Sequence, residues 1–115
     1  MIGEVLKSID IFGNDEVIFT TESGKRYKMY HYQNCCERVK LIDDYEEVLK
    51  SMVGKKVERL DIEYYDGSEH PAHDVYDSST ISEFTFRVNG ATEIIKWFGN
   101  SNGYYCEKAE LEEIK

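Results

Sequence analysis

Two runs of alternating apolar and polar residues flank the dipeptide Asn89-Gly90 in the segment EFTFRVNGATEIIKWF, residues 83–98. A tight type I′ turn needs positive φ at both central positions, and Asn-Gly adopts that conformation at low cost. This turn fixes the register of a hairpin. One face then carries Phe84, Phe86, Val88, Ala91, Ile95 and Trp97, interrupted only by Glu93. Glu83 and Lys96 lie opposite each other on the other face and are expected to form an ion pair.

The first third of the chain predicts a meander of three strands, at 5–12, 17–21 and 26–31. We expect Ser23-Gly24 to form a two-residue loop between the second strand and the third. That loop places Ile18, Tyr27, Met29 and His31 on one face, and Val17, Phe19, Lys28 and Tyr30 on the other. His31 therefore ends a strand.

Residues 42–53 follow the period of an amphipathic helix, with Ile42, Tyr45, Val48, Leu49 and Met52 on one side. Asp43 or Asp44 suits the N-cap, and Gly54 suits the position after the last turn. Further strands are expected at 56–65 and 104–114, with a polar surface loop at 66–80. The predicted fold class is α+β: a mostly antiparallel sheet of about six to seven strands with one main helix. We expect a single domain, 1–115, and an edge strand that favours a dimer or higher oligomer.

The composition argues against several classes of function. The chain has 23 acidic and 14 basic residues, a formal charge of −9. Binding to a phosphate backbone needs clustered Lys and Arg, so we expect no direct nucleic-acid binding. No signal-peptide pattern and no run of about 20 apolar residues is present, so we expect a cytoplasmic protein that does not enter membranes. Phosphate-cradle motifs are absent, and we expect no cofactor.

The segment HYQNCCE, residues 31–37, concentrates reactive side chains. His31, Cys35 and Cys36 offer the ligand types that zinc prefers, but adjacent cysteines rarely both reach one ion. A nucleophilic cysteine with His31 as base and Glu37 as orienting group is also conceivable, but no oxyanion-hole motif accompanies it. Three cysteines without a secretory signal indicate free thiols. We expect Cys35, Cys36 and Cys106 to be reduced, and the adjacent pair to pack as small apolar side chains.

Two other segments contain candidate ligands. His70 and His73, with Asp74, form HPAHD and could hold a metal, although histidines in loops are more often simply solvated. GNSNGYY, residues 99–105, combines side-chain amides, glycine N–H groups and two tyrosines. Those groups suit the rim of a small-ligand or peptide site, whereas the simpler interpretation is a turn that returns aromatic residues to the core.

The segments MYHYQNCCERVKLIDD (29–44) and IIKWFGNSNGYYCEKAEL (94–111) together resemble a small family of uncharacterised proteins from phages and prophage-bearing bacteria. Members carry motifs like H-x-Q-D-C-C-E-x-V and W-Y-G-x-S-N-G-Y-Y-x-E. The residues that match are His31, Gln33, Cys35, Cys36, Glu37, Trp97, Gly99, Ser101, Asn102, Gly103, Tyr104, Tyr105 and Glu107. Asn34 and Phe98 depart from the pattern, and Asn34 removes an acid that could act as base or hard metal ligand. The resemblance implies a phage or mobile-element origin and no particular chemistry.

The leading interpretation is a non-enzymatic accessory protein of phage or mobile-element origin. It would bind a host protein or a small ligand through residues 31–37 and the turn at 99–105, which should meet in space because each begins where a strand ends. The expected ligand-binding residues are His31, Gln33, Glu37, Asn100, Asn102, Tyr104 and Tyr105, with Cys35 and Cys36 as structural thiols. The alternatives are a metal- or thiol-dependent enzyme centred on His31, Cys35 and Cys36, and an acidic decoy of a nucleic-acid-binding protein.

Overall fold

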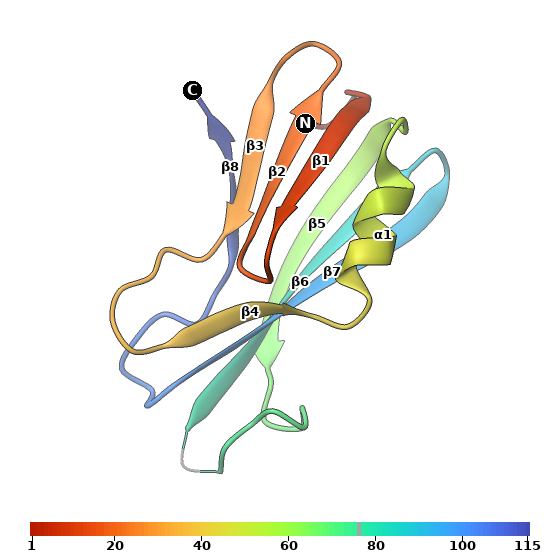
Figure 1. Ribbon diagram of the computed structural model, residues 1–115. Coiled ribbons are helices and arrows are strands. Elements are labelled where there is room, and N and C mark those ends of the chain that lie inside the picture. Colours follow the sequence, from red (N-terminus) through yellow and green to blue (C-terminus); the bar gives the residue numbers. More distant parts are fainter. Residues whose placement is uncertain (76) are drawn as a thin grey trace.

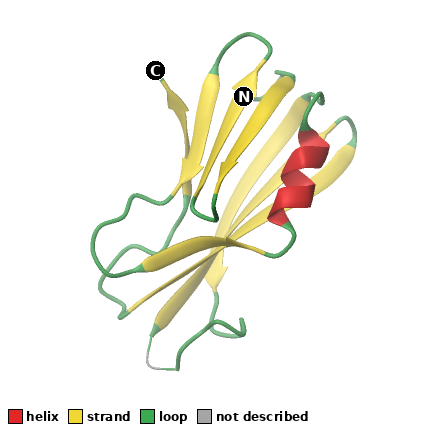
Figure 2. Ribbon diagram, in the orientation of Figure 1, coloured by secondary structure: helices red, strands yellow, loops and turns green. Residues whose placement is uncertain are grey.

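A computed structural model describes residues 1–75 and 77–115, which form eight strands and one helix (Figure 1, Figure 2). The strands are β1 (Leu6–Phe12), β2 (Glu16–Thr21), β3 (Arg26–Tyr30), β4 (Arg38–Ile42), β5 (Val57–Asp66), β6 (Ser78–Val88), β7 (Ala91–Ser101) and β8 (Glu110–Ile114), and the helix is α1 (Tyr45–Met52). They build two antiparallel sheets, ordered β1-β2-β3-β8 and β4-β7-β6-β5. The α+β class, mostly β, is confirmed, but the strands number eight rather than six or seven.

The β6–β7 hairpin has the predicted register. Val88 pairs with Ala91, and Asn89 and Gly90 both have positive φ, 48° and 81°. The predicted apolar face is fully buried at Phe84, Phe86, Val88, Ile95 and Trp97, whereas Ala91 is exposed beside the turn. On the other face Lys96 and Glu83 form the expected ion pair, at 3.7 Å. The register predicted from Asn89-Gly90 is therefore confirmed for the β6–β7 pair.

The predicted register of the β2–β3 hairpin is wrong by one residue. Phe19 pairs with Tyr27 and Val17 with Met29, so these four buried side chains share one face. The loop is residues 22–24 rather than a two-residue turn, and Thr21 and Lys25 hydrogen-bond across it. Gly24 provides the left-handed residue that closes such a loop, with φ of +92°.

The apolar core lies between the two sheets, where the rings of Phe19 and Phe86 are 5.8 Å apart. Along one side the sheets are joined, because Val5 forms a β-bridge with Lys56 and the Leu6 N–H donates to the Lys55 carbonyl at 2.9 Å. β1 and β5 therefore lie side by side at that end (Figure 1). Among the described residues no helix is long and apolar enough to cross a membrane.

The helix is shorter than the predicted 42–53. Residues 38–42 instead form β4, which pairs with the end of β7 and was not predicted. The chain then turns at Asp43, whose φ is 61°, and α1 begins at Tyr45 with Asp44 as N-cap but without a side-chain capping bond. Leu49 and Met52 are fully buried in the core. Ile42 belongs to the strand, so its helical spacing was coincidental.

The end of the β6–β7 hairpin that lies away from the Asn89-Gly90 turn extends past the β1-β2-β3-β8 sheet and supports the candidate site (Figure 1). We call this part the hairpin end. Of the 66–80 segment, predicted as a loop, only residues 67–75 and 77 are described as lying outside strands, because β5 ends at Asp66 and β6 begins at Ser78. We call them the 67–77 loop. Tyr76 lies outside the described residues. This loop covers one face of the hairpin end, where His70 stacks on Phe98 at 4.7 Å. The segment 107–109 covers the other face, where the Ala109 N–H donates to Ser82 Oγ at 3.0 Å.

Candidate functional site

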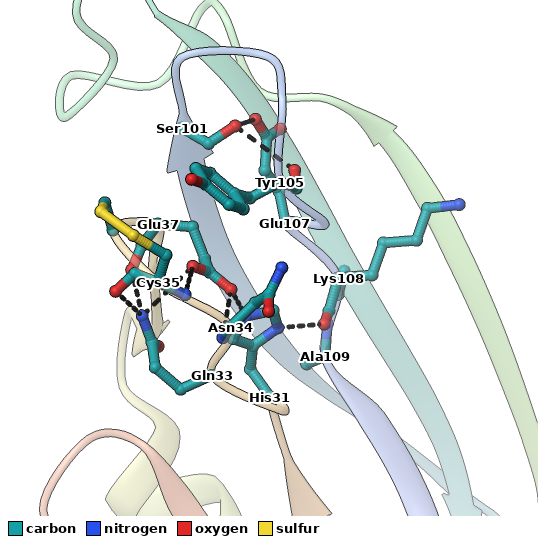
Figure 3. Close-up of polar contacts among 12 residues, drawn as sticks. His31, Gln33, Asn34, Cys35, Glu37, Ser101, Tyr105, Glu107, Lys108 and Ala109 are labelled. Carbon is teal, nitrogen blue, oxygen red and sulfur yellow. Dashed lines mark hydrogen bonds and ion pairs between the residues drawn. A yellow bond between two sulfur atoms is a disulfide. The ribbon is translucent and has the colours of Figure 1, made fainter.

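Two connections between the sheets meet beside the hairpin end. Residues 31–37 lead from β3 to β4, and residues 102–109 lead from β7 to β8. His31 joins them, because its Nδ1 lies 2.8 Å from the carbonyl oxygen of Lys108 (Figure 3). Arg38 also pairs with Asn100 across β4 and β7. Residues 31–37 and the 102–109 connection therefore lie side by side.

The carboxylate of Glu37 is the centre of the 31–37 segment (Figure 3). It is 2% exposed and lies 2.8 Å from His31 Nε2, and it accepts the backbone N–H groups of Asn34 at 2.9 Å and Cys35 at 2.8 Å. Burial raises the pKa of this carboxyl, but the hydrogen bonds from His31 and from the Cys35 and Asn34 N–H groups outweigh burial and lower it to about 2. Glu37 is therefore ionised at neutral pH.

Gln33 completes this cluster through its side-chain amide. Nε2 donates to the Glu37 carbonyl at 2.7 Å and lies 3.2 Å from the Cys35 carbonyl and 3.3 Å from Glu37 Oε1. The His31 imidazole, the Glu37 carboxylate and the Gln33 amide nitrogen thus form hydrogen bonds within the protein. We predicted these three side chains as ligand contacts, whereas the structure shows them folding the segment around a buried carboxylate.

The two adjacent cysteines differ from the sequence prediction. Cys35 and Cys36 are joined by a disulfide, and both are exposed rather than reduced and packed. Neighbouring sulfurs on a tight segment can close this small ring, which spacing alone does not reveal. In this form neither sulfur is available as a thiolate ligand or nucleophile. Cys106 is free, as predicted, and exposed.

Glu107 is a second buried carboxylate, 6% exposed, and it was not predicted as an anchor (Figure 3). It accepts hydrogen bonds from the hydroxyls of Ser101 at 2.5 Å, Thr80 at 2.8 Å and Ser78 at 3.2 Å. Gly99 lies beneath it, and a Cβ there would overlap the Glu107 carbonyl. The sequence signal was present, because hydroxyl residues alternate along β6 at 78, 80 and 82, which leaves small polar side chains on one face.

A cleft of about 480 Å³ opens at the hairpin end, where both motif segments meet the 67–77 loop. Its lining residues are Cys36, Arg38, Ala72, Asp74, Asp77, Asn100, Ser101, Asn102 and Tyr105. We call this the tip cleft. Of the predicted ligand residues, Asn100, Asn102 and Tyr105 line it, while Tyr104 is 85% exposed and packs edge-on against Tyr105. Arg38 and Asp77 were not predicted, because the sequence pattern indicated no strand at 38–42 and no fixed position for the 67–77 loop.

A separate cleft of about 400 Å³ includes one predicted residue, His31, together with Tyr30, Tyr32, Asn34, Cys106, Lys108 and Glu110. His31 and the tip cleft are therefore not parts of one pocket.

The HPAHD histidines pack on the hairpin end. Nδ1 of His73 is 2.6 Å from Ser79 Oγ, and Nδ1 of His70 accepts the Ala72 N–H at 3.1 Å. Within residues 1–75 and 77–115, no group of three or more His, Cys, Asp or Glu side chains is arranged to hold a metal ion.

Comparison with known proteins gave one match. A family model described as a domain of unknown function, DUF7448, matches residues 1–111. No curated protein and no solved structure matches the chain. The matched range includes both motif segments, both buried carboxylates and every residue of the tip cleft.

Proposed function

The chain belongs to the DUF7448 family, a domain of unknown function, and we propose that it is a non-enzymatic binding protein whose tip cleft takes a small polar ligand with an anionic group. The observation that carries this proposal is that residues from both sequence motifs line one cleft. The resemblance of those motifs adds a phage or mobile-element origin and a role in the bacterial cytoplasm to the proposal.

The size and lining of the tip cleft favour a small polar molecule. Its volume of about 480 Å³ falls within the ordinary range of small-molecule sites. Arg38 is exposed at the start of β4, and no ion pair joins it to another described residue. A guanidinium presents several N–H donors in one plane, which matches a carboxylate or phosphate. Asn100 and Asn102 add amides. Asp74 and Asp77 also line the cleft, so the ligand should carry hydroxyl or amine donors beside its anionic group.

The surroundings of the tip cleft favour a preformed site. Glu37 anchors the segment that carries Cys36 and leads into Arg38, and Glu107 ties the 102–109 connection to β6 through Ser78 and Thr80. Buried, hydrogen-bonded supports of this kind hold lining side chains in place before a ligand arrives, which reduces the entropy lost on binding.

Binding rather than catalysis is favoured by where the acid–base groups lie. His31 and Glu37 are the obvious pair for proton transfer, but they are buried against each other and neither lines the tip cleft. A general base must reach the proton that it removes. Because neither residue lines the tip cleft, neither can reach a proton of a ligand bound there.

The proposal is tested by titrating ¹⁵N-labelled protein with panels of amino acids, dicarboxylates, sugar phosphates and nucleotides while recording amide shifts. We expect a binder to shift the amides of Arg38, Asn100 and Asn102 and the ring signals of Tyr105. Arg38→Ala should weaken that binding by about tenfold or more, because a charged hydrogen bond to the anion is lost.

Lys40→Ala is the matched control. Lys40 is the next exposed cation on the same face of β4 but does not line the tip cleft. Equal affinities for the Arg38 and Lys40 variants, or shifts confined to other surfaces, would contradict the proposal.

A further inference from the structure

The disulfide between Cys35 and Cys36 occupies a distinctive position. Both residues are exposed, and Cys36 lines the tip cleft beside Arg38. The bond joins neighbours in the chain, and Figure 3 shows it at the outer side of the segment that Glu37 anchors.

Stabilisation of the fold is a poor explanation. A disulfide stabilises a protein mainly by restricting the unfolded chain, and this effect grows with the number of residues in the closed loop. No residue lies between Cys35 and Cys36, so the bond restricts the unfolded chain as little as any disulfide can.

The segment is also held in place without the disulfide. The Cys35 N–H donates to Glu37 Oε1 at 2.8 Å, and the Asn34 N–H donates to Glu37 Oε2 at 2.9 Å. Gln33 Nε2 donates to the Glu37 carbonyl at 2.7 Å. None of these contacts involves sulfur, so the backbone of residues 33–37 keeps its anchors when the sulfur–sulfur bond opens.

We propose that Cys35 and Cys36 form a site of reversible thiol–disulfide exchange with low-molecular-weight thiols, and that its oxidation state sets the shape of the tip-cleft rim. Both sulfur-bearing residues are exposed, which gives an attacking thiolate access. In a reducing compartment, disulfides that persist are usually redox-active rather than structural. This inference does not depend on the identity, or the existence, of a ligand in the tip cleft.

The exchange proceeds in two displacement steps. A small-molecule thiolate attacks Sγ of one cysteine, the Cys35–Cys36 bond breaks, and a mixed disulfide forms while the other cysteine leaves as a thiolate. A second small thiolate attacks the sulfur of the small molecule in that mixed disulfide, which releases the oxidised small disulfide. The two cysteine sulfurs gain two electrons and take up two protons, and the two small thiols lose them. Oxidation by the small disulfide is the reverse.

The structural consequence is local. The disulfide holds the Cys36 side chain against Cys35, whereas reduction of the disulfide lets both side chains rotate about χ1. Because Arg38 and Cys36 line the same cleft, amides on this rim and across it at Asn100 should report the change. The core lies on other elements and should not.

The test uses the full chain with Cys106→Ser, since Cys106 is a free thiol outside the disulfide and would add to the label count. The protein is equilibrated in mixtures of reduced and oxidised glutathione, started from both its oxidised and its reduced form. Exchange is then stopped with acid, the protein is unfolded and labelled with excess thiol-alkylating reagent near neutral pH, and its intact mass is measured. We expect no label at the oxidising end, two labels at the reducing end, and the same curve from both starting forms.

A second measurement separates exchange from a structural role. Amide spectra of the oxidised and reduced Cys106→Ser protein should differ at residues 34–38 and 99–102 and agree in the core, with nearly equal urea midpoints. The Cys35→Ser/Cys36→Ser double variant should fold and resemble the reduced form.

Four results would overturn the inference: two labels even in fully oxidised glutathione, different curves from the two starting forms, unfolding on reduction, or unfolding of the double variant. Failure of the ligand titration with Arg38→Ala leaves each of these readouts unchanged, so the two proposals fail separately.

Discussion

The imidazole of His31 lies between two acceptors: Nε2 is 2.8 Å from Glu37 Oε2, and Nδ1 is 2.8 Å from the carbonyl oxygen of Lys108. One imidazole ring therefore links the end of β3, the anchor ahead of β4 and the connection that leads to β8.

Replacing Glu37 by Gln should destabilise the protein. The amide keeps the size of the side chain but offers one acceptor oxygen, so the His31, Asn34 and Cys35 donors can no longer all be satisfied. We expect a clear drop in the urea midpoint with an unchanged m-value. Glu22→Gln, an exposed carboxyl in the β2–β3 loop, should leave the midpoint where it is. Equal midpoints for the two variants would show that Glu37 is not an anchor.

The same carboxyl predicts how stability depends on acid. The pKa of Glu37 is about 2 in the folded protein, against 4.5 for an unperturbed glutamate. A carboxyl whose pKa is lower in the folded state stabilises the fold above the unfolded value, and this contribution is lost as the pH falls through the folded value. The urea midpoint should therefore fall between pH 4.5 and about 2, and Glu37→Gln should flatten this fall. Parallel curves for the wild type and the variant would contradict the assignment.

Short-range signals in the sequence predicted the fold where one dipeptide determines the geometry. Asn89-Gly90 fixed a register because a type I′ turn leaves no alternative. Ser23-Gly24 did not fix the register of the β2–β3 hairpin. A single glycine is compatible both with a two-residue turn and with a longer loop that ends in a left-handed residue. β4 was missed because it is short and its Ile42 also fits the period of the helix that follows.

The site was predicted only in its location. Motif positions indicated that residues 31–37 and 99–105 would come together, and one cleft is lined by Cys36 and by residues 100–102 and 105. The sequence could not show whether a polar side chain faces a ligand or folds its own segment. That choice depends on long-range partners such as Lys108 for His31 and the hydroxyls of β6 for Glu107. Arg38 was not predicted as a site residue. It lines the tip cleft because β4 pairs with β7 and places Arg38 opposite Asn100.

The second anchor can be tested by a double-mutant cycle. Thr80→Val removes the hydroxyl that donates to Glu107 at 2.8 Å while keeping the shape of the side chain, and Glu107→Gln removes the charge. We expect each variant to be less stable and the pair to be non-additive by roughly 1 kcal/mol or more in urea unfolding, because they share one hydrogen bond. Thr85→Val, on the opposite face of β6, is the control and should be additive with Glu107→Gln. Additivity at Thr80 would mean that the hydroxyl contributes nothing to holding Glu107.

Gly99 should be the glycine least able to accept a side chain. A Cβ at this position would overlap the carbonyl of Glu107 and lie 2.9 Å from its carbonyl carbon, so the backbone of 107–109 must move. Overpacking of this kind costs about 1–3 kcal/mol and sometimes more. We expect Gly99→Ala to lower the urea midpoint and to shift the amide signals of Glu107 and Ala109.

Gly67→Ala is the matched control for Gly99→Ala, because it also lies on the hairpin end. Its added Cβ would meet the Ser79 Cβ at 3.3 Å, a distance that a few tenths of an ångström of adjustment relieves. Its effect should therefore be the smaller of the two, with the 107–109 amides unmoved. If Gly67→Ala were the more damaging, or if Gly99→Ala left the Glu107 amide in place, the segment could not be packed on β7 as described. The close approach at Gly99 would then have no structural role, although the residue belongs to one of the two sequence motifs.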